Sequence, residues 1–116
     1  MPRLVILESA KRDLGDIAER IATDSMSPET ADHFIDKVIG HLHKLAASPI
    51  LMGRARPELR PTYRSVPFGN YIIFLTYDTE GVGPRDVLKI IHVLWGARDL
   101  DAYFATADND DTNDGT

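Results

Sequence analysis

Apolar residues recur at intervals of three and four in two stretches of the first half of the chain. Between residues 10 and 21 they form one narrow stripe, and between residues 31 and 46 they form a wider one. This spacing places the apolar side chains of each stretch on one side of an α-helix. The sequence therefore predicts two amphipathic helices that form an antiparallel hairpin laid on a sheet.

Polar residues and a proline mark the ends of these helices. Ser9 can accept a hydrogen bond from a free backbone N–H, so we expect it to cap the first helix, which Thr23–Ser27 then interrupts. Pro28 restarts a helix, because a proline in the first turn lacks only an N–H that would have no helical partner there. Ahead of both helices, Arg3–Leu7 is a short run that favours a strand.

The second half of the chain shows short apolar runs in place of helical spacing. Three strands are predicted, at Thr62–Val66, Tyr71–Tyr77 and Val87–Leu94. Several prolines precede them, so Pro49–Pro61 is interpreted as a long, stiff loop of the kind that usually carries function in a small domain. After the strands, a short helix is predicted at Ala97–Ala105.

The strand predicted at Tyr71–Tyr77 is apolar on both of its alternating faces. A strand of this kind must be covered on both sides. The helical hairpin can cover one side of the sheet, but only the short helix at Ala97–Ala105 is left for the other. This imbalance predicts an apolar surface that a partner would cover.

Size and composition limit the chemistry. The chain has 116 residues, of which 43% are apolar, which suffices for one modest core that we assign to residues 1–106. It has no cysteine, so disulfides, thiol catalysis and cysteine-ligated zinc are excluded, as suits a reducing cytoplasm. No apolar run approaches the roughly 20 residues that span a bilayer, and no signal peptide is evident. We therefore expect a cytoplasmic protein without membrane contact.

The net charge of −5 is unevenly distributed. Four aspartates fall in the segment 107–116, which offers almost no apolar area to bury and is expected to be a disordered acidic tail. With that segment set aside, acidic and basic residues nearly balance. Arg54, Arg56, Arg60 and Arg64 lie within one short stretch. An anionic target would therefore have to meet this local patch, because the overall field repels it.

Four local strings, in this order, resemble the ParE branch of the RelE/ParE toxin superfamily. They are Ala10-x-x-Asp13-Leu14-x-x-Ile17, the stretch from Leu45 through Gly53-Arg54 to Pro57-Glu58-Leu59-Arg60, Tyr63-Arg64-Ser65 followed by Gly69 to Phe74, and Val93 to Leu100. The predicted order of strand, two helices and three strands is also similar to that family. The resemblance implies an α+β fold, with the hairpin packed on a small, mostly antiparallel sheet and a short C-terminal helix.

The resemblance further implies the toxin of a type II toxin–antitoxin system, which arrests growth when free and is neutralised by a ParD-like antitoxin. It implies DNA gyrase as the target, inhibited by binding, with no cofactor and no direct DNA binding by the toxin alone. Two alternatives stay open: a RelE-type ribosome-dependent mRNA endoribonuclease, and a non-toxic member that keeps only antitoxin binding. In ParE-like toxins the last matching string usually contains an arginine and, just ahead of the glycine, a histidine. At these two positions this chain has His92 and Trp95.

Two sets of side chains are candidates for a site. Tyr63, Arg64 and His92 could form an acid/base set for RNA cleavage, although a histidine alternating with Leu88 and Ile90 is more often a hydrogen-bonded core residue. The candidates for binding a target or antitoxin are Arg54, Arg56, Arg60, Arg64, Tyr71, Ile73, Trp95 and Arg98. No metal site is predicted, because the three histidines of the second helix do not share one face.

Overall fold

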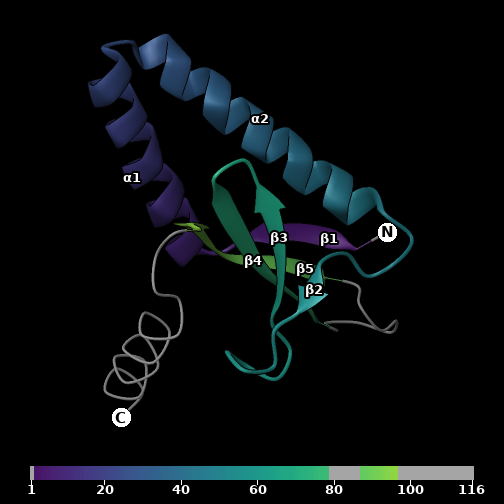
Figure 1. The fold of residues 1–116 in the computed structure, drawn as a ribbon. Coiled ribbons are helices and arrows are strands. Elements are labelled where there is room, and N and C mark those ends of the chain that lie inside the picture. The colour runs from purple at the N-terminus through teal and green to yellow at the C-terminus, as the bar shows by residue number, and fades with distance from the viewer. Residues whose placement is uncertain (1, 79–86, 97–116) are drawn as a thin grey trace.

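The computed structural model describes residues 2–78 and 87–96 (Figure 1). Its elements are β1 (Arg3–Ile6), α1 (Glu8–Ser25), α2 (Pro28–Ala47), β2 (Arg54–Ala55), β3 (Arg64–Phe68), β4 (Tyr71–Asp78) and β5 (Val87–Trp95). This is the predicted order with β2 added, which forms inside the segment interpreted as a loop. The predicted helix at Ala97–Ala105 and the tail 107–116 lie outside the described residues.

The five strands form one sheet in the order β1-β5-β4-β3-β2. β1 runs parallel to β5, and the remaining neighbours pair in the antiparallel sense. Both helices lie on the same side of this sheet, with α1 and α2 forming the hairpin (Figure 1). The predicted α+β architecture with a mostly antiparallel sheet is therefore confirmed.

The ends of the helices agree only in part with the predictions. α1 begins at Glu8 with Leu7 in the capping position, so the prediction that Ser9 caps it is wrong. The Ser9 hydroxyl instead donates to the backbone oxygen of Ile91 at 2.6 Å. α2 starts as predicted: Pro28 stands in its first turn and the Ser27 side chain accepts from the backbone N–H of Thr30.

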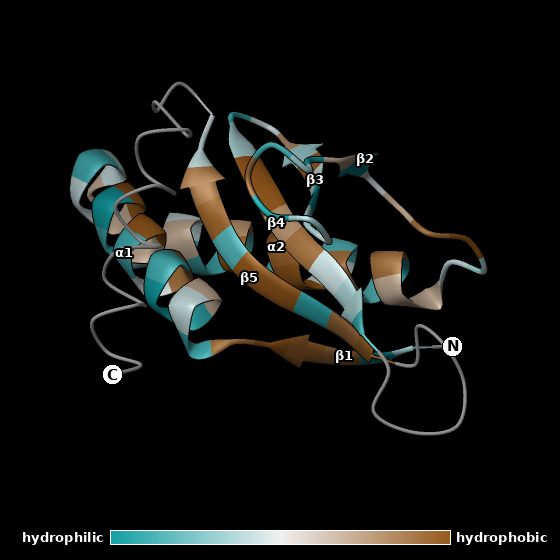
Figure 2. Cartoon of the chain, turned by 90° about the horizontal axis from the view of Figure 1, so that it is seen from below, coloured by the Kyte–Doolittle hydropathy of each residue, from teal (hydrophilic) through white to brown (hydrophobic). Residues whose placement is uncertain are grey.

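The main core lies between the helices and the sheet. Leu14 of α1 and Leu42 of α2 pack there against Ile73 and Leu75 of β4 and Ile90 of β5. Figure 2 shows hydrophobic colour along most of β4 and β5, interrupted on β5 by two hydrophilic bands. The apolar residues that recur at intervals of three and four in the sequence are therefore the ones that pack in this core.

The opposite face of the sheet is covered by a loop. The backbone N–H of Arg56 donates to the oxygen of Tyr63 at 2.8 Å, which closes residues 56–63 into a compact turn. Leu59 from this turn packs against Phe74 and Leu94, and Phe74 has no exposed surface. The prediction that only a C-terminal helix was available for this face is therefore wrong, because the proline-rich segment folds back over it.

A β-bulge separates the two halves of β5. Phe74 pairs with His92 whereas Leu75 pairs with Ile90, so Ile91 is the extra residue. One inserted residue exchanges the two faces of a strand from that point on. His92 therefore shares a face with Phe74, and the predicted alternation of His92 with Ile90 is wrong.

Candidate functional site

The arginine-rich segment is anchored by Arg64. Its Nε donates to the carbonyl oxygen of Met52 at 2.8 Å, and its Nη2 donates to that of Gly53 at 2.7 Å. The backbone N–H of Met52 also donates to the hydroxyl of Tyr77 at 3.0 Å. The two-residue strand β2 supplies few backbone partners, and the Arg64 guanidinium satisfies the Met52 and Gly53 carbonyls instead. Arg64 therefore fixes the chain where it approaches the sheet.

Gly53 makes that approach possible. Its φ is +87°, and a Cβ at this position would lie 2.8 Å from the backbone oxygen of Ser65 and 2.9 Å from Val66 Cγ2. Both the backbone conformation and the space therefore require glycine. β2 can pair with β3 only because this residue lets the two backbones come close.

The remaining three arginines differ in their surroundings. Arg56 Nε lies 2.7 Å from Glu58 Oε2, and its Nη1 donates to the Ser65 hydroxyl at 3.2 Å. The Arg60 guanidinium lies 6.0 Å from the centre of the Tyr63 ring, at the limit of a cation–π contact. Arg54 is exposed on β2. The four arginines therefore differ in how far their side chains are engaged within the chain.

The carboxyl group of Glu58 responds to this environment. The hydrogen bond from Arg56 lowers the pKa of Glu58, and its own backbone N–H and the charges of Arg56 and Arg54 lower it further. The anionic form is therefore favoured, although about half of the Glu58 side chain is exposed to water. This pair neutralises part of the positive charge that the sequence attributes to the segment.

The three side chains considered for RNA cleavage do not converge. Arg64 pairs with Leu75, on the face that the helices cover, whereas His92 pairs with Phe74 on the opposite face. Tyr63 packs beside Phe74 in the small cluster under the loop. Tyr63 and Arg64 line one hollow of about 200 Å³ together with Tyr77, whereas His92 bonds Asp13 at the edge of β5, so the three side chains do not form one set.

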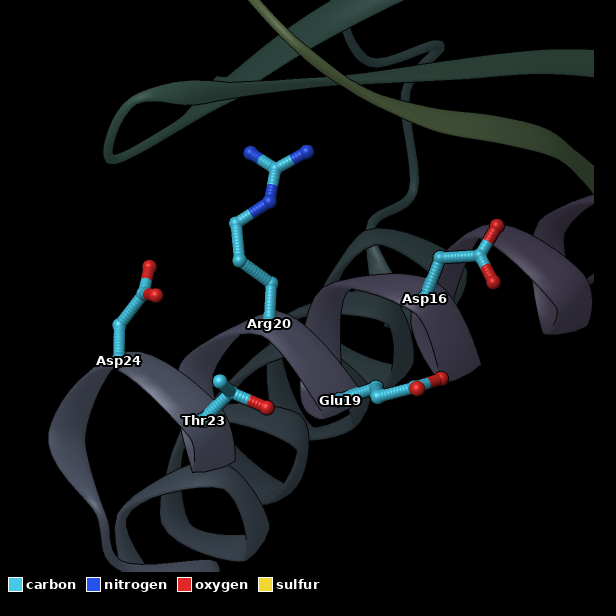
Figure 3. Close-up of a pocket in the computed structure, with 5 residues that line it drawn as sticks. All are labelled: Asp16, Glu19, Arg20, Thr23 and Asp24. Carbon is cyan, nitrogen blue, oxygen red and sulfur yellow. The ribbon is translucent and has the colours of Figure 1, made fainter.

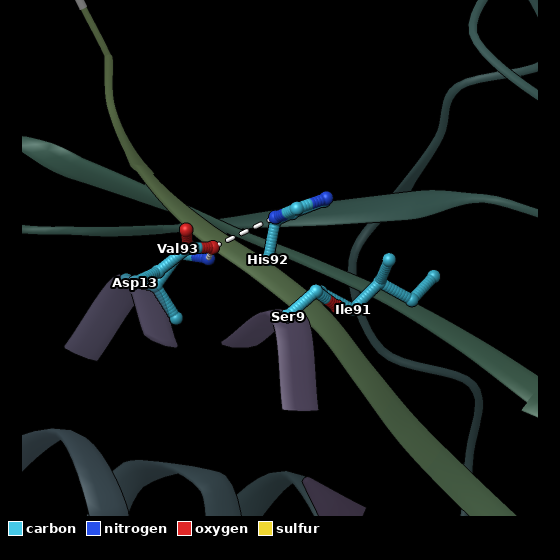
Figure 4. A network of polar contacts seen from close by, with 5 residues as sticks. All are labelled: Ser9, Asp13, Ile91, His92 and Val93. Carbon is cyan, nitrogen blue, oxygen red and sulfur yellow. Dashed lines mark hydrogen bonds and ion pairs between the residues drawn. The ribbon is translucent and has the colours of Figure 1, made fainter. Parts of the chain in front are cut away.

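His92 takes part in a polar network at the edge of β5 (Figure 4). Its Nδ1 lies 2.7 Å from Asp13 Oδ2, and the same oxygen accepts from the backbone N–H of Val93 at 3.0 Å. β1 pairs with β5 only as far as Ile90. Beyond that point Ser9 and Asp13 of α1 bond the backbone of β5, so side chains replace the missing strand.

Next to this network, a groove of about 210 Å³ separates α1 from the end of β5. Its described lining consists of Asp13, Asp16, Ile17, Arg20, Tyr71, Val93, Leu94 and Trp95. Trp95 pairs with Tyr71 across the strands and is 50% exposed. Of the predicted binding residues, the structure therefore brings Tyr71 and Trp95 together on one groove wall.

Sequence reasoning missed the α1 side of this groove. Asp13, Asp16 and Arg20 are spaced at three and four, which places them on one helical flank beside the buried Ile17. That spacing was the available signal. Ile73, predicted to bind a partner, is fully buried under the helices and offers no open surface here, while Arg98 lies outside the described residues.

Two further possibilities concern metals and membranes. Within residues 2–78 and 87–96, no three histidine, aspartate or glutamate side chains gather closely enough to hold a metal ion. Neither α1 nor α2 combines the length and hydropathy that a membrane-spanning helix needs.

Comparison with known proteins places this architecture in a family. Residues 4–100 match the family model described as the ParE toxin of the type II toxin–antitoxin system parDE. The chain belongs to the ParE toxin family. Toxin ParE1 of Mycobacterium tuberculosis, in strains CDC 1551 / Oshkosh and ATCC 25618 / H37Rv, is 30% identical over 69 residues, which are 60% of this chain and 67% of that protein.

A solved structure supports the same fold. It is titled chromosomal ParDE TA system from P. aeruginosa and superposes with a TM-score of 0.63. The match covers 82% of this chain and 96% of that one, at 18% sequence identity. At this identity the likeness concerns the fold alone.

Proposed function

We propose that this ParE-type toxin arrests growth when free, is neutralised by a ParD-like antitoxin, and acts in the cytoplasm by binding DNA gyrase. The family match over residues 4–100 is the observation that carries this proposal. The mode of action is binding, without a cofactor and without direct contact of the free toxin with DNA. The near-neutral body of the chain suits a protein target better than a nucleic acid.

The arrangement of the candidate catalytic residues supports binding over RNA cleavage. A general acid or base must reach the proton that it transfers, and a cation must reach the phosphate that it stabilises. Two donors of Arg64 are directed at the carbonyl oxygens of Met52 and Gly53. Nδ1 of His92 is directed at Asp13. Cleavage by these two residues would require Arg64 to leave its hydrogen bonds and to act together with a His92 that pairs on the opposite face of the sheet.

Induced expression of the chain in a bacterial host tests the proposal. We expect DNA synthesis to fall and the SOS response to rise while protein synthesis continues at first. Purified toxin should inhibit supercoiling by purified gyrase, and co-expression with the protein encoded next to the toxin gene should restore growth. Rapid loss of translation with cleaved messages would assign the chain to the RelE type instead. Unimpaired growth would indicate that the chain is a non-toxic family member that only binds its antitoxin.

Substitution of His92 separates the two modes of action. An asparagine amide nitrogen takes the place of Nδ1 and can still donate a hydrogen bond to Asp13, but it cannot carry a proton at neutral pH. The variant His92→Asn should therefore arrest growth as the parent does. Loss of arrest in a folded His92→Asn protein would speak for catalysis. Leu42→Asp, which places a charge in the core, provides the unfolded control.

A further inference from the structure

A second hollow extends the groove at Trp95 along α1. It has a volume of about 300 Å³ and is lined, among the described residues, by Asp16, Glu19, Arg20, Thr23 and Asp24 (Figure 3). Asp16 and Arg20 line both hollows, so the two hollows adjoin along one flank of α1. The α1 trough, as we call it, runs from Trp95 along the exposed flank of the helix toward Asp24.

The charge of the α1 trough is predominantly negative. Asp16, Glu19 and Asp24 are exposed carboxylates, and no ion pair engages them within the described part of the chain. Arg20 is the one cation on this flank in the described lining, and it extends from α1 toward the strands (Figure 3). A flank with three carboxylates and one guanidinium attracts a positively charged ligand.

The end of the trough at Trp95 adds apolar contact. Half of the Trp95 surface is exposed, and the neighbouring lining includes the buried side chains of Ile17 and Val93. An indole ring offers both an apolar area and an aromatic face that attracts ammonium and guanidinium groups. The trough therefore combines one apolar anchor point with a row of carboxylates at the spacing of a helix.

We infer that the α1 trough docks a basic amphipathic segment of a protein partner. Lysine or arginine side chains of the segment pair with Asp16 and Asp24, and an aliphatic side chain packs against Trp95. The inference rests on the proposed function in one respect, because the ParD-like antitoxin is then the expected carrier of this segment. Paired N–H donors favour arginine over lysine opposite the carboxylates.

Other occupants fit the charges less well. The segment 107–116 of the same chain carries Asp108, Asp110, Asp111 and Asp114, so its charge has the same sign as the trough. Nucleic acid phosphates are repelled for the same reason. A second copy could offer the segment around Arg54, but Arg56 and Arg64 of that segment already bond their own chain. A basic partner is therefore the occupant that the charges select.

Trp95 is the chain's single tryptophan, so its fluorescence reports directly on the trough. The probes are an amphipathic helical peptide of leucine and arginine and its counterpart with glutamate in place of each arginine. The arginine peptide should shift Trp95 emission to shorter wavelength in a saturable manner, because binding removes the indole from water. The glutamate peptide should bind about tenfold more weakly or not at all, a difference of about 1.4 kcal/mol.

Charge reversal provides the matched pair of variants. Asp16→Lys should weaken binding of the arginine peptide about tenfold and make the remaining binding less dependent on salt. Asp32→Lys reverses an exposed charge on α2, away from the trough, and should change the affinity less than twofold. Trp95→Phe removes the signal, and calorimetry then checks that the peptide still binds.

Several outcomes would overturn the inference. They are equal binding of the two peptides, equal effects of Asp16→Lys and Asp32→Lys, a shift of Trp95 emission on removing residues 107–116, or self-association that Asp16→Lys abolishes. The last two would identify the tail or a second copy as occupant. Growth arrest by the free chain tests the proposed function separately: arrest without peptide binding contradicts only the trough, and peptide binding without arrest contradicts only the toxin function.

Discussion

The two faces of the sheet are covered in different ways. On one face, α1 and α2 bury Leu14, Leu42 and their neighbours at regular helical intervals against β4 and β5. On the other face, the loop of residues 56–63 packs Leu59 and Tyr63 against Phe74 and Leu94. The packing of the first face follows from the regular spacing of apolar residues, which repeats along both helices. The second depends on a few individual contacts that hold the loop in place.

This difference determines how each face responds to mutation. Many neighbours share the burial on the helix-covered face, so a deleted side chain leaves a cavity that rigid elements cannot close. On the loop-covered face a deleted side chain leaves a loop that can settle inward. The contacts that hold the loop, namely Gly53, Arg64 and the Arg56–Glu58 pair, become the sensitive points instead.

The largest effect is expected from truncating the core beneath the helices. Leu42 has no exposed surface, and Leu42→Ala should lower the free energy of unfolding by about 3–4 kcal/mol. Leu59→Ala on the opposite face should lower it by about 2 kcal/mol, at the low end for such changes. Urea titration of both variants measures the difference. Equal losses would mean that the loop is as rigid as the helical hairpin.

Gly53 should produce the next largest effect. An added methyl group meets the Ser65 carbonyl at 2.8 Å and forces a side chain into a backbone conformation with positive φ. Gly53→Ala should therefore destabilise by about 2 kcal/mol. Gly40→Ala is the matched control, because that glycine lies in α2 with open space around it and alanine favours the helix. The control should gain stability, and a similar loss in both variants would contradict the close approach of β2 to β3.

The helical half of the fold could be predicted because its signals are local. The spacing of Leu14, Ile17 and their neighbours and the Ser27–Pro28 pair contain the information for both helices within a few residues. β2 was missed because two residues next to Gly53 carry no strand pattern. Their pairing with β3 depends on the positive φ of that glycine and on contacts with residues nine or more positions away.

The candidate site was less predictable, for two identifiable reasons. The bulge at Ile91 exchanges the faces of β5, so an alternation that starts at Leu88 misplaces His92. The groove at Trp95 needs Asp16 and Arg20, which approach β5 only because α1 replaces β1 along the strand edge. The alternation of apolar residues in a strand does not reveal where a bulge will insert a residue. The spacing of polar residues in a helix does not reveal which strand the polar side of the helix will contact.

Arg64 offers a smaller and more specific test of the loop-covered face. Its guanidinium reaches the carbonyls of Met52 and Gly53 together, whereas a lysine ammonium can satisfy one of them well. Arg64→Lys should therefore cost about 1 kcal/mol. Arg54→Lys is the control at an exposed arginine of the same segment and should leave the melting temperature unchanged. Equal effects of the two substitutions would show that the positive charge of Arg64, rather than the paired N–H donors of its guanidinium, holds the loop.

The smallest effect is expected at Glu58, and it should depend on pH. The hydrogen bond from Arg56 lowers the pKa of Glu58 in the folded chain relative to the unfolded chain. The contribution to stability is then present above the unfolded-state pKa and is lost as the pH falls through the lowered folded-state pKa. Because Glu58 lies at the surface and its charge is screened by water, the contribution is small. Glu58→Gln should melt slightly below the parent at neutral pH and together with it in acid. High salt should reduce the difference at neutral pH. A difference that persists unchanged in acid would show that the Arg56–Glu58 ion pair does not secure the loop, and that packing of Leu59 holds this face alone.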